Sequence, residues 1–152
     1  MVKTTGPWAL AEIEGFLGGA AIPLRLTCVR SDGYPLVVSL WYHYRDGVLQ
    51  CVSHRNAFLV KVLRENPKLG FEVAPERPPY HGVRGTGDAT LTELGESGLL
   101  ESLLDRYLGG RECRVGQWLL SRKEDELVIT IAPRQFTSWD YRQRMADVVD
   151  AG

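Results

Sequence analysis

The chain has 152 residues, the size of one domain with a substantial hydrophobic core. Its composition, 44% hydrophobic and 24% charged, is that of an ordinary globular protein. Lysine and arginine number 18 against 19 acidic residues, and this net charge of -1 argues against a general nucleic-acid binder, because phosphate backbones attract an excess of positive charge. We therefore expect one domain over residues 1–152 and no nucleic-acid partner.

Cysteine use and hydropathy bear on the cellular compartment. The 3 cysteines are an odd number without a C-x-x-C pair, so a disulfide framework is not expected. The first seven residues lack the apolar stretch of a signal peptide, and no segment approaches the roughly 20 apolar residues that span a bilayer. These features predict a cytoplasmic protein with reduced thiols and no membrane segment.

Hydrophobic periodicity in the first half of the chain changes from helical to alternating. Apolar residues recur at helical spacing over residues 9–17, and a Gly-Gly pair follows them. Three alternating segments, joined by short glycine-containing turns, then predict consecutive antiparallel strands over 24–28, 36–44 and 48–53.

The second half adds helices between further strands. Residues 56–65 return to helical periodicity and stop at an Asn-Pro pair. Strands follow at 69–73 and 83–94, the second interrupted by Gly85 and Gly87, where we expect a bulge or a close backbone approach. The remaining elements are two helices and one long strand, over 97–108, 115–119 and 127–139. The sum is about six strands and four short helices, a β-rich α+β barrel.

The histidines and glycines do not form a recognisable metal or nucleotide motif. His43, His54 and His81 lack a second ligand at i+3 or i+4, so no metal site is predicted and each is expected to be structural. The glycines of segment 82–87 lie within a strand rather than between a strand and a helix, which does not fit the dinucleotide fingerprint. Metalloenzyme and dinucleotide-binding functions are therefore disfavoured.

Several segments share the order and spacing of one known protein family. They are Ser31–Pro35 with the strand Leu36–Tyr42, Asp46-Gly47, the segment that ends at Ser53, Leu63–Pro67, Pro78–Gly85 and Thr137–Met145. In this order they resemble the flavin-binding proteins related to pyridoxamine-phosphate oxidase, over most of residues 9–94 and the last strand. The resemblance implies a six-stranded antiparallel split β-barrel with short peripheral helices.

The resemblance also implies a homodimer that holds one FMN per subunit in a groove between the two barrels. Backbone facing the isoalloxazine ring would come from one strand segment: Val38, Ser39, Leu40 and Trp41. Ser53 would take the place of the family's phosphate-binding hydroxyl. The other subunit would contribute a second set: Gly82, Val83, Arg84 and Trp139. Arg142 lies in the C-terminal block that resembles the family's flavin-contacting tail.

The run Ser53-His54-Arg55-Asn56-Ala57 points to an anion site independently of any family, since it leads from a strand end into a helix. Free N–H groups and the macrodipole at a helix start favour negative charge. Arg55 and, one turn into the helix, Lys61 can add charge-assisted hydrogen bonds to a phosphate. In the alternative interpretation, Asn56 only caps the helix and Arg55 is solvated. Arg84 and Trp139 likewise fit either a flavin wall or a strand-face charge and a core aromatic.

Two departures from the family pattern narrow the expected function. The family's lysine at the helix start is replaced by the uncharged Ala57-Phe58-Leu59, so phosphate binding rests on Arg55, Ser53 and backbone N–H groups. The oxidase carries an Arg-x-His pair where this chain has Arg142-Gln143-Arg144, which disfavours oxidation of pyridoxamine phosphate.

The leading hypothesis is an FMN-binding oxidoreductase with a small-molecule substrate, in which Arg84 stabilises the reduced, anionic flavin. Deazaflavin and FAD are alternative cofactors. The second class is a non-enzymatic dimer that binds flavin or haem, with His54 or His81 as a haem ligand.

Overall fold

The computed structural model describes residues 1–149, and residues 150–152 of the expected domain lie outside the described part. The strands are β1 (Lys3–Thr5), β2 (Leu24–Val29), β3 (Pro35–Leu40), β4 (His43–Arg45), β5 (Val48–His54), β6 (Lys68–Val73), β7 (His81–Glu93) and β8 (Glu126–Asp140). The helices are α1 (Leu10–Gly19), α2 (Phe58–Glu65), α3 (Leu99–Leu108) and α4 (Arg114–Ser121), with a 3-10 turn at Lys123–Asp125. No described helix has the length and apolar character needed to cross a bilayer.

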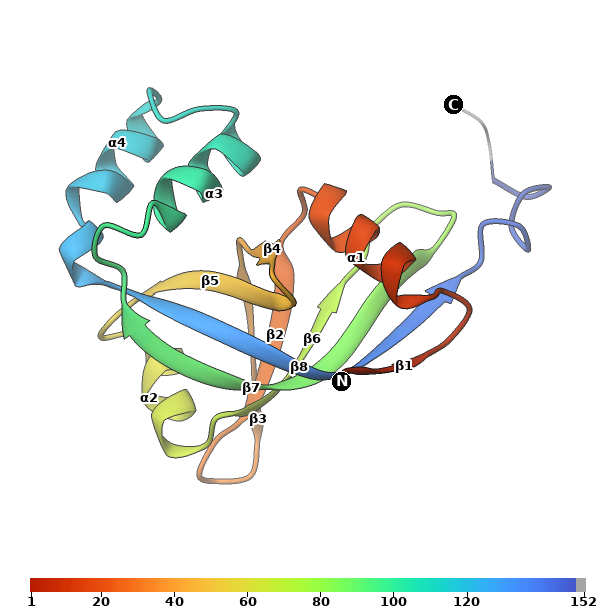
Figure 1. The fold of residues 1–152 in the computed structure, drawn as a ribbon, viewed down its shortest axis with the longest axis horizontal. Helices are drawn as coiled ribbons and strands as arrows, with labels where there is room; N and C mark the ends of the chain where they lie inside the picture. The colour runs from red at the N-terminus through yellow and green to blue at the C-terminus, as the bar shows by residue number, and fades with distance from the viewer. Residues whose placement is uncertain (150–152) are drawn as a thin grey trace.

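The strands form one curved sheet in the order β3-β2-β6-β7-β8-β5-β4, and β1 pairs with β8 (Figure 1). Every pair along this path is antiparallel. The tight β4–β5 hairpin turns through Asp46 and Gly47, whose φ angles of 53° and 79° are those of a type I′ turn. Figure 1 places α1 and the α3–α4 pair on one side of the sheet and α2 on the other.

The α+β class is confirmed, but the expectation of a six-stranded antiparallel barrel is wrong in three respects. The segment expected as one strand over 36–44 divides into β3 and β4, because the buried Tyr42 turns its hydroxyl to the carbonyls of Leu17 and Ala20 at 2.7 and 3.1 Å. β1 adds a strand that pairs in parallel with β8. Among the described residues no ladder joins β3 to β4 or β5, so the sheet stays open.

The main core lies inside the curve of the sheet. Ile13 and Leu17 of α1 pack into it, as do Leu59 and Leu63 of α2, and all four are at most 4% exposed. α2 presents these residues at helical spacing and ends before the Asn-Pro pair, as predicted. Both helices bury one face in this core, and the opening in the sheet is bordered by the strands β3 and β5.

α3 forms a second apolar cluster outside the barrel and ties the end of α1 to the sheet. The cluster comprises Leu94, Leu99, Leu100, Leu103, Leu104 and Val128. From α3, Arg106 donates hydrogen bonds to the carbonyls of Leu17, Gly18 and Ala20 at 3.0, 2.8 and 2.6 Å. A cation on the last carbonyls of a helix offsets the negative end of its dipole. α3 therefore fixes where α1 ends.

The bulge expected in the seventh strand is confirmed. The pairing of β7 with β8 shifts register between Thr86 and Gly87. A Cβ at Gly87 would lie 2.6 Å from the carbonyl oxygen of Ala132, so only glycine fits this approach.

Candidate functional site

The open sheet has two free edges that border its opening. Within residues 1–149, β3 pairs only with β2, so its other edge carries backbone groups that no described strand pairs. In the same part of the chain β4 covers only Val48–Gln50 of β5, which leaves one edge of Cys51–His54 without a strand neighbour. The segment Val38–Trp41 and the residues Ser53 and His54 thus lie on the two borders of one opening.

Trp41 and Tyr42, which follow β3, contact Tyr107, a residue that sequence reasoning missed. The Trp41 indole stacks on the Tyr107 ring of α3, with centroids 5.2 Å apart and planes 8° from parallel. The Tyr107 hydroxyl accepts a hydrogen bond from the Tyr42 amide at 3.1 Å and donates one to the Ile22 carbonyl at 2.9 Å. Burial raises the pKa of Tyr107, which keeps this hydroxyl protonated. Only its place on the apolar face of a predicted helix hinted at such a contact.

The remaining strand residues of the first set alternate in orientation. Val38 and Leu40 are half-buried and pack on the main core, while Ser39 is exposed on the outer face. Ser39 pairs with Arg25 across β2 and β3. Side chains of this segment therefore face both sides of the sheet, and its backbone faces the opening.

The junction between β5 and α2 differs from the simple capping interpretation. α2 begins at Phe58 with Ala57 in the N-cap position and no side-chain cap, so the expectation that Asn56 caps the helix is wrong. The Asn56 amide donates to Nδ1 of His54 at 3.1 Å instead. Lys61 is exposed and lines a separate cavity of about 250 Å³ with Arg30 and Glu65.

Arg55 makes a bidentate ion pair that no sequence motif indicated. Its guanidinium donates to the two carboxylate oxygens of Glu93 at 3.1 and 2.7 Å and to the Glu124 carbonyl at 2.8 Å. The pKa of Glu93 is lowered by this hydrogen-bonded arginine, so the carboxylate is ionised at neutral pH. Glu93 lies 38 residues further along the chain, which is why the pair could not be predicted locally.

The predicted partner-subunit residues meet where β7 begins and β8 ends. Gly82 pairs with Trp139, and a Cβ at Gly82 would lie 2.8 Å from Cζ2 of that indole, so the ring covers the glycine. The Arg84 guanidinium lies 5.6 Å from the centroid of the Trp139 ring, within cation–π distance. Val83 is fully buried in the core. Arg84 is exposed and Trp139 is half-buried, and together they form one cationic and aromatic patch.

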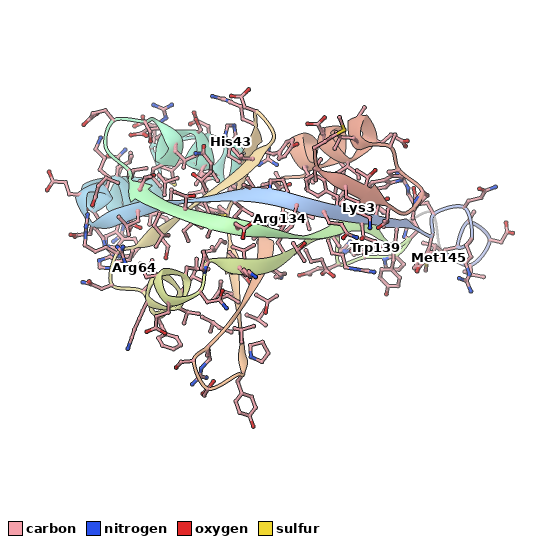
Figure 2. All side chains as sticks on the ribbon, turned by 60° about the horizontal axis from the view of Figure 1, so that its bottom comes forward. Lys3, His43, Arg64, Arg134, Trp139 and Met145 are labelled. Atoms are coloured by element: carbon pink, nitrogen blue, oxygen red, sulfur yellow. The ribbon has the colours of Figure 1, made fainter. Side chains whose placement is uncertain are left out.

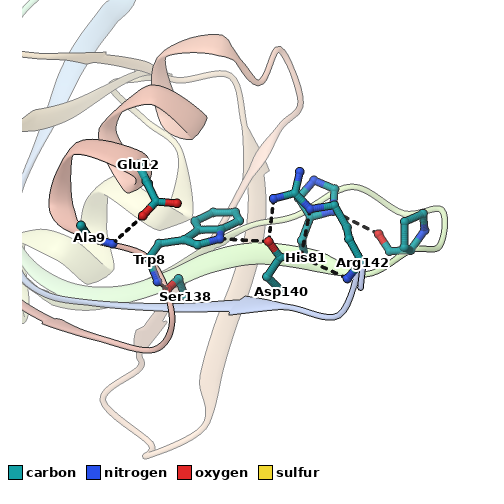
Figure 3. Close-up of polar contacts among 8 residues, drawn as sticks. Trp8, Ala9, Glu12, His81, Ser138, Asp140 and Arg142 are labelled. Atoms are coloured by element: carbon teal, nitrogen blue, oxygen red, sulfur yellow. Dashed lines mark hydrogen bonds and ion pairs between the residues drawn. The ribbon is translucent and has the colours of Figure 1, made fainter. Parts of the chain in front are cut away.

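Arg142 follows the end of β8 and is held by its own neighbour, Asp140 (Figure 3). Its Nε and a terminal nitrogen donate to the Asp140 carboxylate at 2.9 and 2.6 Å, and Trp8 Nε1 donates to the same carboxylate at 3.0 Å. The guanidinium also lies 5.7 Å from the centroid of the Trp8 ring. Asp140 is a third residue, after Tyr107 and Glu93, that sequence reasoning missed.

Within one chain, Ser53 and the Trp139 end of β8 stay apart. Ser53 pairs with Leu127 at the start of β8, whereas Gly82 pairs with Trp139 near its end. Twelve residues of strand separate these positions, a contour of about 40 Å. Figure 2 shows Trp139 toward one end of the molecule and Arg64 of α2 toward the other. The segment Val38–Trp41 is closer to the patch, because Ser39, Arg25, Glu72 and Arg84 lie in one row of register partners. One chain therefore carries two separate half-sites, one at Ser53 and one at the Arg84–Trp139 patch.

Between the half-sites, the outer face of β2, β6 and β7 is hollowed by small residues. Thr27, Gly70 and Thr86 are register partners across the three strands. Two hollows of about 530 and 650 Å³ adjoin at Thr27 and Gly70, and Arg84 lines the larger one. Both have the size of small-molecule pockets, and both are open to solvent. Aligned small residues were visible in the sequence only once the register was known.

The histidines are not arranged around a metal position, and residues 1–149 contain no group of three or more His, Cys, Asp or Glu side chains that could hold one. His81 sits in an aromatic cluster, 5.8 Å from Phe16 and 6.3 Å from Trp8 between ring centroids. Burial, with Arg45 and Arg106 nearby, lowers the pKa of His43.

No protein-family model and no curated protein matches the chain in sequence. Among solved structures, the conserved hypothetical protein Rv2991 from Mycobacterium tuberculosis is similar over 100% of this chain and 97% of its own, at 21% identity and a TM-score of 0.81. An F420 reductase is similar at 24% identity and a TM-score of 0.64, over 79% of this chain and 92% of its own. A pyridoxamine 5′-phosphate oxidase-like protein from Listeria innocua has 20% identity and a TM-score of 0.60, over 84% of this chain and 95% of its own. The chain has the pyridoxamine-phosphate-oxidase-like fold. At these identities the likeness concerns the fold alone.

Proposed function

We propose that two copies of this chain bind a flavin-type cofactor between them and use it in a redox reaction on a small molecule. The observation that carries the proposal is the separation of the half-sites. One is the end of β5 at Ser53, and the other is the Arg84–Trp139 patch at the far end of β8. A single chain cannot close a site from both, whereas a second copy placed on the hollowed face brings one half-site of each chain together.

The residues of the two half-sites suit a planar, anionic cofactor. The free edges of β3 and β5 offer backbone donors and acceptors to the polar rim of an isoalloxazine ring. Trp139 offers an aromatic wall, and Arg84, for which no ion-pair partner is found among the described residues, supplies positive charge beside the ring. When bound, a flavin supplies the hydride or electron transfer, and the protein orients the ring and stabilises its reduced, anionic form.

FMN is the first candidate and a deazaflavin the second. The similar F420 reductase supports the deazaflavin. A phosphate of either cofactor at the β5–α2 junction has to compete with Glu93 for Arg55. Direct competition between FMN and F420 for the same protein distinguishes the two candidates.

Binding of cofactor to the purified protein tests the proposal. We expect FMN or F420 to bind at micromolar concentration, with quenched flavin fluorescence, and Arg84→Ala to weaken binding about tenfold, the effect of one charge-assisted contact. Arg122→Ala is the matched control, because Arg122 also lies over a tryptophan ring, that of Trp118 at 4.5 Å, but lines neither hollow. Binding of haem with no affinity for any flavin, FAD included, would overturn the proposal.

A further inference from the structure

We propose that Glu93 competes with the phosphate of the cofactor for Arg55 and thereby sets how strongly the chain binds a phosphorylated flavin. This inference rests on the proposed function. The observation that carries it is that Arg55, at the β5–α2 junction, is already bound to the Glu93 carboxylate.

The strand register explains how the pair forms. Ser53 of β5, Leu127 of β8 and Glu93 of β7 lie in one row of paired residues. Arg55 follows Ser53 by two residues, and its guanidinium crosses the start of β8 to reach Glu93. It therefore reaches away from the edge of β5 that borders the opening.

The geometry of the pair is the one a phosphate would use. Two parallel N–H···O bonds join the guanidinium to the Glu93 carboxylate, and arginine binds phosphate oxygens with the same fork. A third bond to the Glu124 carbonyl leaves two of the five guanidinium N–H donors free. The carboxylate thus occupies the donors that a ligand phosphate would need.

The pair is also placed so that Arg55 can exchange the Glu93 carboxylate for a phosphate. The side chains of Arg55 and Glu93 are 35% and 67% exposed, so parting them buries no unpaired charge. Glu93 is charged at neutral pH because Arg55 lowers its pKa, and competition therefore operates under ordinary conditions. On the other side of the junction, the first turn of α2 has no acidic residue and no side-chain cap, so nothing there repels an anion.

Glu93→Gln tests the competition, since glutamine keeps the size of the side chain and removes its charge. We expect the Kd of FMN, measured by fluorescence quenching, to fall about tenfold, while the Kd of riboflavin, which lacks the phosphate, stays within about twofold. In an Arg55→Ala background, Glu93→Gln is expected to give no such gain. Inorganic pyrophosphate is expected to displace FMN from the variant more readily than riboflavin.

Asp125→Asn is the matched control, because Asp125 is the other carboxylate whose charge acts on Arg55, and its removal leaves the bidentate pair untouched. An equal gain from Asp125→Asn would show a general charge effect and overturn the proposal. An unchanged or higher Kd of FMN in Glu93→Gln, with normal binding by the unmodified protein, would overturn it while leaving the proposed function standing. If neither protein binds FMN, F420 or riboflavin, the proposed function falls as well.

Discussion

Residue 82 is a glycine, and the absence of a side chain there leaves room for the Trp139 ring of the Arg84–Trp139 patch. The backbone of Gly82 lies under the Trp139 indole, with the carbonyl of Val73 and the Cβ of Ala74 within 2.8 Å of any added Cβ. Two of these three neighbours belong to the backbone or to a short side chain, so the clash can be relieved only by moving the tryptophan or the strand.

Gly82→Ala is therefore expected to lower the free energy of unfolding by about 1–3 kcal/mol and to displace the Trp139 ring from Arg84. Urea denaturation and the fluorescence maximum of the protein measure the two effects. Gly15→Ala is the control, because Gly15 lies within α1 with nothing inside 4 Å of an added Cβ. That change is expected to be neutral or to stabilise the chain by about 0.5–1 kcal/mol. Equal effects at the two glycines would contradict the close approach.

Asp140 gives the chain a pH dependence whose sign follows from its contacts. Hydrogen bonds from Arg142, together with one from Trp8, hold the pKa of this carboxyl well below its ordinary range. The unfolded chain binds the proton more readily, so the stabilisation is complete above the unfolded pKa of about 4 and is lost as the pH falls below it.

Asp140→Asn is accordingly expected to destabilise the chain by about 1 kcal/mol near neutral pH, through the loss of charge-assisted hydrogen bonds. The difference from the unmodified protein narrows between about pH 5 and about pH 2. Urea unfolding over this range measures it, and a difference that does not change with pH would contradict the assigned cause.

The residues that the sequence singled out differ from Glu93, Asp140 and Tyr107, which it did not, in how local their signals are. The glycines of β7, the segment Val38–Trp41 and the Arg84–Trp139 patch are marked by strand alternation and by family-like spacing. Glu93 and Tyr107 meet partners 38 and 65 residues away, and Asp140 meets Trp8, 132 residues away, in addition to its neighbour Arg142. The distant contacts are determined by the fold alone. A charge that looks free in the sequence, such as Arg55, can therefore be neutralised in the structure.

At the level of elements, α3 holds the end of α1 and the start of β4 together. Arg106 binds three carbonyls at the end of α1, and its guanidinium lies 5.0 Å from the centroid of the Tyr42 ring. Tyr107, the next residue, holds the Tyr42 amide and stacks on Trp41. The position of Trp41 and Tyr42, between β3 and β4, is thus set by α3 as well as by the strands.

Arg106→Lys is expected to loosen this arrangement, because one ammonium group cannot reach all three carbonyls in the guanidinium geometry. We expect a loss of about 1–2 kcal/mol in stability and faster hydrogen exchange over α1 and the Trp41–Tyr42 link. Arg111→Lys provides the control, since Arg111 makes only an exposed ion pair with Asp105 and a comparable effect there is not expected. Unchanged exchange over α1 in Arg106→Lys would show that the sheet, not α3, fixes the helix.

The sequence predicted most helices and strands because their apolar residues follow one period. Where it failed, a tertiary contact overrode the local pattern. Residues 36–44 are rich in residue types that favour strands, yet the strand is interrupted at Tyr42, whose hydroxyl donates a hydrogen bond to the end of α1. Lys3–Thr5 has no apolar alternation at all, and it becomes a strand only because β8 offers a free edge beside Gln135–Thr137.

For the whole molecule, the two half-sites and the hollowed face make the second copy the central expectation. Thr86 lines the hollow of about 530 Å³ and is exposed in the isolated chain, so on this proposal the partner covers it. An arginine at position 86 would enter the interface beside Lys68 and Arg134, where Asp88 is already paired with Arg134. An unpaired charge costs on the order of 3–5 kcal/mol in a buried contact.

Thr86→Arg is therefore expected to turn a dimer into a monomer at micromolar concentration and to abolish cofactor binding at the same time, as measured by sedimentation and by flavin fluorescence. Thr90→Arg makes the same change at an exposed position four residues along β7, outside both hollows, and both properties are expected to persist. The two readouts are linked because each half-site needs its counterpart from the other chain. A Thr86→Arg protein that stays dimeric would place the second copy on another face, and one that is monomeric yet still binds flavin would show that a single chain completes the site.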